Sequence, residues 1–139
     1  MYCRSIVILT TALLAGCADE SIRAFQAKVD NNFHTVEIAV DPAVDPNARF
    51  SQLKFQALFH ESTYGVAGHV AYDKSCKMLQ IKGKFIGTDG GTVAAGIGAV
   101  TSYDKSEDRP FEMGPTERLS TSIGGAKLSK IVITGITCL

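Results

Sequence analysis

Apolar and polar residues alternate along most of this chain, which is the period expected of half-buried β-strands. The clearest case is the segment 50–59, where every second residue from position 53 is apolar. The residues predicted to face inward there are Leu53, Phe55, Ala57 and Phe59. The segment 33–40 alternates in the same way, with Val36, Ile38 and Val40 on one face. Five further strands are predicted at 66–72, 78–86, 92–100, 119–123 and 129–137.

Turn-forming residues separate these segments. Asp41 to Asn47 contains two prolines, which lack an N–H donor and restrict the preceding residue, so this stretch ends the strand before it. Further turns are predicted at 72–75, 88–91 and 123–125, and the polar stretch from Tyr103 to Arg109 is predicted to be a long exposed loop. About seven or eight short strands without a helical pattern indicate an all-β fold, either an antiparallel sandwich or a small barrel.

The first sixteen residues have a different pattern. A short positive end, Met1 to Arg4, precedes an apolar run from Ser5 to Leu14, and the small residues Ala15 and Gly16 follow. This is the layout of a secretory signal, and its apolar run is shorter than the ~20 residues that a membrane-spanning helix needs. We therefore predict that residues 1–16 are a signal peptide.

The end of that signal, Leu14-Ala15-Gly16-Cys17, resembles the lipobox of bacterial lipoproteins. The resemblance implies cleavage before Cys17 and a lipid on the Cys17 sulfur, which would hold the protein on a membrane. Ala18, rather than aspartate, follows the cysteine, and by the sorting pattern of lipoproteins this implies the outer membrane. The alternative is ordinary signal cleavage after Ala18, which would give a soluble periplasmic or secreted protein.

Behind the signal we expect two regions. Residues 17–30 are predicted to be a lipid-anchored tether with a possible first strand, although Ile22, Phe25 and Val29 also have helical spacing. Residues 31–139 are predicted to be the β domain.

The chain has four cysteines, and the predicted signal peptide and lipobox assign a role to two of them. Cys3 would leave with the signal peptide and Cys17 would carry lipid. Cys76 and Cys138 then remain in an exported protein, where disulfides form and persist, so we predict a bridge between them. Two separate reduced thiols are the alternative. A metal site is less favoured, because neither cysteine has a second ligand nearby in the sequence.

The segment from Gly68 to Ile136 resembles the bacterial FxLyD-type domain, an immunoglobulin-like sandwich of exported proteins and lipoproteins. The stretch Phe85-Ile86-Gly87-Thr88-Asp89-Gly90 carries the likeness, with Gly87 and Thr88 in place of the usual Leu and Tyr. Gly68-His69-Val70 resembles the opening strand of that family, and the segment 111–119 resembles its later turn. The resemblance implies an interaction or scaffolding role and no catalytic residues. Small secreted fibronectin-III-like proteins are similar. Without either family, Phe85 would fill a core and Asp89-Gly90 would form a hairpin turn.

The charge and the candidate ligand residues argue against two classes of function. The net charge is zero, with no basic run, which argues against nucleic-acid binding. His60, His69 and Asp73 would form a metal or acid–base site if paired strands brought them together, but the solvent face of a strand is favoured for both histidines and for His34.

Two more patterns are assigned to structure. Asp41 and Asp45 fit an ordinary turn better than a calcium loop. The small residues from Ala94 to Ala99 fit a strand that either packs closely or leaves an edge bare, rather than a phosphate loop.

The sequence therefore predicts a non-enzymatic lipoprotein of the cell envelope, without metal or cofactor, whose β domain binds an unidentified envelope protein. A freely secreted binding protein is the second interpretation, and a small envelope enzyme is the third.

Overall fold

The chain is built almost entirely of β-strands. The computed structural model describes residues 20, 23–24, 36–58, 63–116 and 128–139. Their seven strands are β1 (Glu37–Val40), β2 (Arg49–Leu58), β3 (Thr63–Ala71), β4 (Cys76–Gly87), β5 (Thr92–Tyr103), β6 (Asp108–Pro115) and β7 (Leu128–Cys138). The predicted all-β fold is confirmed.

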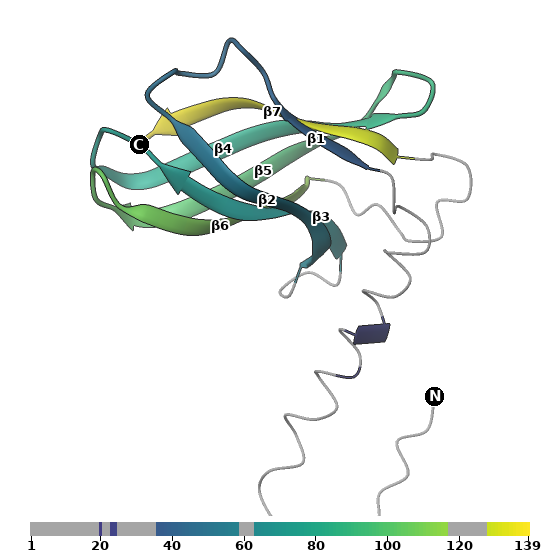
Figure 1. The fold of residues 1–139 in the computed structure, drawn as a ribbon, viewed down its shortest axis with the longest axis horizontal. Helices are drawn as coiled ribbons and strands as arrows, with labels where there is room; N and C mark the ends of the chain where they lie inside the picture. Colours follow the sequence, from purple (N-terminus) through teal and green to yellow (C-terminus); the bar gives the residue numbers. More distant parts are fainter. Residues whose placement is uncertain (1–19, 21–22, 25–35, 59–62, 117–127) are drawn as a thin grey trace, which may run out of the picture.

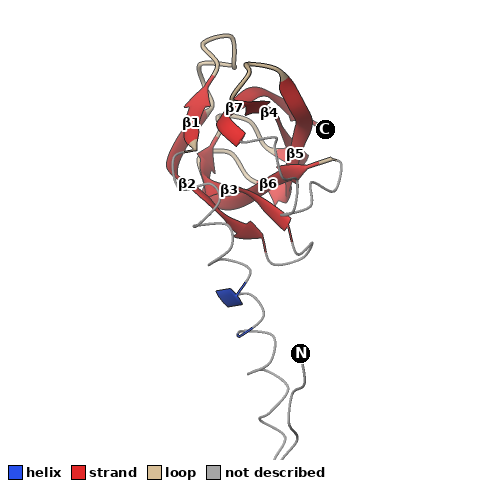
Figure 2. Ribbon diagram, turned by 90° about the vertical axis from the view of Figure 1, so that its right-hand side faces the viewer, coloured by secondary structure: helices blue, strands red, loops and turns tan. Residues whose placement is uncertain are grey.

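All seven strands belong to one sheet, in the order β1-β7-β4-β5-β6-β3-β2. The sheet curls strongly, so that its two halves face each other across a common interior in the manner of a sandwich (Figure 1). Seen from the side turned by 90°, the strands surround that interior in a nearly barrel-like ring (Figure 2). The neighbouring pairs are antiparallel except β1 and β7, which run parallel with Glu37 opposite Lys130 and Val40 opposite Ile133.

The interior is filled by side chains from every strand. Tyr103, Phe85, Leu79, Ile81 and Met113 are the bulkiest of those that are almost completely buried. Burying one such side chain contributes about 1.5–3 kcal/mol, so this shared core holds the sheet in its curled form.

A bulge in β2 explains why three large apolar residues all face inward although their spacing does not fit the two-residue period of a strand. Between Ser51 and Lys54 the register with β3 shifts, and Gln52 takes the left-handed conformation with a φ of 52°. Phe50 lies before the bulge, and Leu53 and Phe55 lie after it; all three pack against the core. The prediction for Leu53, Phe55 and Ala57 is confirmed. Strict alternation would place Phe50 on the opposite face, but the extra residue in the bulge restores it to the core.

Two predictions for described strands are wrong in part. Val36 and Ile38 pack against the core as predicted, but Val40 is 39% exposed. Val40 lies in an edge strand, which has a neighbour on one side only. The predicted loop 103–109 is shorter than expected: Tyr103 ends β5 and is buried, Asp108 begins β6, and the exposed residues 104–107 between them form the turn.

β6 is not among the predicted strands, and its residues alternate between an outward and an inward face. Asp108, Pro110 and Glu112 are exposed, whereas the alternate residues Phe111 and Met113 point into the core. Pro110 lies opposite His69 of β3, at a level where β5 makes no paired contact with β6. A proline without an N–H donor is therefore tolerated inside the sheet.

Several predictions concern residues outside the described part. These are the signal and lipobox, the strand 119–123, and the positions His34, His60 and Phe59. In the predicted tether, the described residues Glu20, Arg23 and Ala24 are exposed and helical, which favours the helical alternative at those three positions.

Candidate functional site

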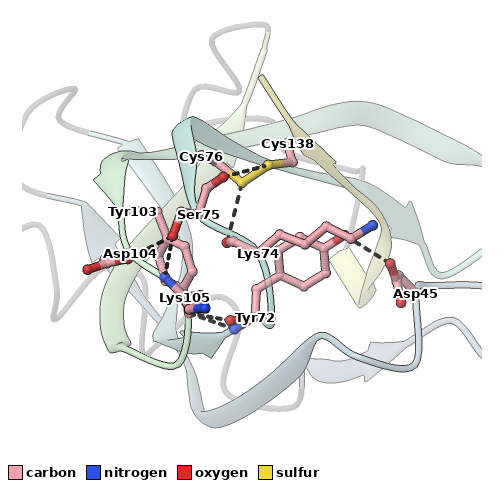
Figure 3. Close-up of a disulfide and its surroundings, with 9 residues drawn as sticks. All are labelled: Asp45, Tyr72, Lys74, Ser75, Cys76, Tyr103, Asp104, Lys105 and Cys138. Atoms are coloured by element: carbon pink, nitrogen blue, oxygen red, sulfur yellow. Dashed lines mark hydrogen bonds between the residues drawn. A yellow bond between two sulfur atoms is a disulfide. The ribbon is translucent and has the colours of Figure 1, made fainter.

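The predicted bridge between Cys76 and Cys138 is present. It joins the start of β4 to the end of β7 across a sequence separation of 62 residues, with a Cα–Cα distance of 5.3 Å (Figure 3). The same two strands are hydrogen-bonded there, because Met78 and Leu139 exchange both backbone N–H···O bonds at 3.1 and 2.9 Å. The disulfide therefore locks a strand pair that is already in register, which is a structural role.

A buried tyrosine organises the turns beside the disulfide. The Tyr72 N–H donates to the Tyr103 hydroxyl oxygen at 2.6 Å. The Tyr103 hydroxyl donates in turn toward the carbonyl oxygens of Glu107 at 2.6 Å and Tyr72 at 3.1 Å (Figure 3 shows the Tyr72 contacts). Because every polar function of this hydroxyl is used by backbone, Tyr103 connects the turn after β3 to the turn after β5.

Asp45 extends this network to the segment between β1 and β2. Its carboxylate accepts a hydrogen bond from the Asn47 N–H at 3.0 Å and another from the Tyr72 hydroxyl at 2.9 Å. The hydrogen bond from the Asn47 backbone N–H, together with the one from the Tyr72 hydroxyl, lowers the pKa of Asp45. Desolvation raises the pKa of the Tyr72 hydroxyl. The lowered pKa of Asp45 and the raised pKa of Tyr72 fit a hydrogen bond from a neutral hydroxyl to an ionised carboxylate. With Asp41 accepting from the Ala43 N–H at 2.8 Å, the predicted ordinary turn is confirmed.

The described members of the histidine hypothesis do not form a metal site. His69 projects from the outer face of β3 as predicted, and its Nδ1 lies 3.5 Å from a carboxylate oxygen of Asp108. Asp73 is exposed in the turn after β3. Within the described ranges, no three or more histidine, cysteine or acidic side chains are grouped so that they could hold a metal ion.

The small residues of β5 serve close packing, which was one of the two predicted alternatives. β5 lies in the interior of the sheet between β4 and β6, so it leaves no edge bare. A side chain at Gly98 would collide with the backbone carbonyl of Glu112, and one at Gly96 would press on the Phe85 ring at 2.9 Å. Glycine at these two positions lets β6 and Phe85 approach β5.

A hollowed surface lies on the outer face of the sheet. Two adjoining shallow depressions, of about 600 and 540 Å³, share Ala99 and Glu112. Their floor is made of small residues from β3, β6 and β5: Ala67, Gly98, Ala99 and Gly114. Gln52, Lys54 and Gln56 of β2 form one wall, and Met78, Gln80 and Ile97 form the other. We call this surface the outer trough.

Two opposite charges stand in the outer trough without a partner in the described chain. Lys54 and Glu112 are both exposed, and neither belongs to the ion pairs found among the described residues, which involve His69, Arg109 and Lys130. Ile97 adds an apolar side chain that is 44% exposed at the far wall. The outer trough thus combines small apolar groups, amides and two unused charges, which suits contact with another macromolecule.

No family model, curated protein or solved structure matches the chain. The resemblance to the FxLyD-type domain therefore stays a prediction based on its residues. The expectation made for these residues without either family is confirmed: Phe85 is buried, and Asp89-Gly90 lie in the turn between β4 and β5, with Gly90 at a φ of 83°. Within the described residues, no helix is long and apolar enough to cross a membrane.

Sequence reasoning missed the outer trough. Lys54, Ala67 and Glu112 are distant in the sequence and meet only through the pairing of β2 with β3 and of β3 with β6. The available signal is the outward alternation of Pro110, Glu112 and Gly114 in β6, a strand that is not among those predicted from the sequence.

Proposed function

We propose that the chain is an exported lipoprotein of the bacterial outer membrane, anchored through lipid on Cys17, and that its disulfide-bonded β domain is a protein-binding or accessory module. The observation that carries this proposal is how the cysteines are used. Cys17 stands at the end of a lipobox-like motif, and Cys76 and Cys138 are bonded to each other. Such a bridge is typical of an oxidising compartment outside the cytoplasm.

The shape of the domain supports binding as its role. The outer trough is broad and open, and its walls carry amides and charges on long side chains. Small-molecule sites are usually enclosed and mostly apolar, whereas macromolecular contacts are broad and have polar rims.

Metabolic labelling tests the anchor. The full chain is expressed in a Gram-negative host with an alkyne fatty acid, and the mature protein is examined by intact mass and detergent partitioning. We expect a labelled, detergent-soluble product, and we expect Cys17→Ser to abolish the label. The matched control, Cys76→Ser with Cys138→Ser, should keep it. A water-soluble, unlabelled product that begins at Asp19 would instead establish ordinary cleavage and the secreted alternative.

The position after the cysteine supplies a second test. If the protein is sorted as a lipoprotein, density fractionation should place it with the outer membrane. Ala18→Asp should move it to the inner membrane without changing the label. Equal distribution of both forms would contradict the proposed destination.

A further inference from the structure

We infer that the outer trough binds a second copy of this chain about a two-fold axis. The inference deepens the proposed binding role by naming its partner, and it rests on that role. It does not depend on the lipid, so it can be tested on protein without the anchor.

One row of residues crosses the outer face from β2 to β6. Lys54 of β2 lies opposite Ala67 of β3, and Ala67 lies opposite Glu112 of β6. Neighbouring strands are about 4.8 Å apart, so the Lys54 and Glu112 backbones are separated by about 10 Å with Ala67 midway. A cation and an anion, each unpaired within the described chain, therefore flank a small residue symmetrically.

This arrangement is complementary to itself. Consider a second copy that packs face to face, related by a two-fold axis that runs parallel to the strands above Ala67. The rotation exchanges the two sides of the row, so Lys54 of each copy meets Glu112 of the other. Two equivalent ion pairs form, as an isologous interface requires.

The same rotation makes the shapes match. The β2 wall of each copy lies over the β6 floor of the other, because β2 and β6 are equally distant from β3. By the same register, Gln52 and Gln56 are then near Pro110 and Gly114, which have a short ring and no side chain. The long side chains of one copy thus fill the hollow of the other.

A modest affinity is sufficient for such a contact in the proposed setting. Copies confined to one membrane by lipid have a higher effective concentration than copies in solution. We therefore expect a reversible dimer of the unanchored protein at micromolar to millimolar concentration.

Charge exchange tests the geometry. The chain from residue 17, with Cys17→Ser, is exported behind a cleavable signal so that the disulfide forms, and its mass is followed by sedimentation velocity against concentration. Lys54→Glu alone brings two carboxylates together at both contacts, and Glu112→Lys alone brings two ammonium groups together at both contacts. Each should weaken the dimer at least about tenfold. The matched controls Lys84→Glu and Asp89→Lys change charge by the same amount outside the outer trough and should not.

The decisive measurement is whether combining the two charge reversals restores the dimer. A mixture of Lys54→Glu with Glu112→Lys should form a heterodimer in which charges of opposite sign meet at both contacts, one pair native and one reversed, and the double variant should dimerise with itself through two reversed ion pairs. A protein that is monomeric throughout the concentration range, or a dimer that is indifferent to both reversals, would overturn the inference. Circular dichroism checks that each variant is folded. Because the lipid is absent from this experiment, its failure leaves the labelling test of anchoring unaffected.

Discussion

Removal of the Cys76–Cys138 disulfide should cost this domain a large part of its stability. The perturbation is Cys76→Ala with Cys138→Ala in the unanchored Cys17→Ser chain. The bond closes a loop with a sequence separation of 62 residues, and constraining such a loop in the unfolded chain contributes about 4 kcal/mol. For a domain of this size that corresponds to a fall in melting temperature of roughly 20 °C. The folded state should change little, because the Met78–Leu139 hydrogen bonds hold the strands together without the bridge.

Urea unfolding followed by circular dichroism measures the effect. Reduced Cys17→Ser protein should match the double variant, and reductant should not affect the double variant itself. The dependence of the unfolding free energy on urea should become steeper without the bridge, because the unlinked chain exposes more surface when it unfolds. A loss below about 1 kcal/mol would show that the bridge constrains little of the unfolded ensemble, and the loop-closure reasoning would be wrong.

Two further predictions test the packing and the core. Gly98→Ala should destabilise the domain by about 1–3 kcal/mol, because the new methyl group would collide with the Glu112 carbonyl, whereas Gly135→Ala, with nothing within 4 Å of the added atom, should be neutral or gain up to about 1 kcal/mol in the same urea assay. Burial raises the pKa of Tyr64 to about 12 from its usual value of 10.0, so the unfolded chain ionises first and stability should fall as pH rises from about 10 to 12. Tyr64→Phe should reduce that alkaline loss, and an unchanged pH profile would contradict the assignment.

The local pattern of the sequence was sufficient to predict most strands. Alternation identified the inward residues Leu53 and Phe55, and elimination among four cysteines identified the pair that is bonded. These inferences depend on local period or on chemistry, which a single sequence displays directly.

The features that could not be predicted from the sequence depend on pairing between distant segments. No local signal distinguishes the bulge at Gln52 from regular strand, and Tyr103 lies among polar residues although its hydroxyl is buried against the backbone of Tyr72. The parallel pairing of β1 with β7 and the row from Lys54 to Glu112 exist only once the strand order is known. The chain topology, rather than composition, creates the candidate binding surface.

The parallel pairing of β1 with β7 also has a mechanical consequence. A pull directed along the axis of β1 would load the ladder along Glu37–Val40 in shear, so its bonds would have to yield together. Force that crosses this ladder enters β7, which the disulfide joins covalently to β4 inside the sheet. An edge strand of four residues can thereby serve as a force-bearing joint between the β domain and the chain that precedes it.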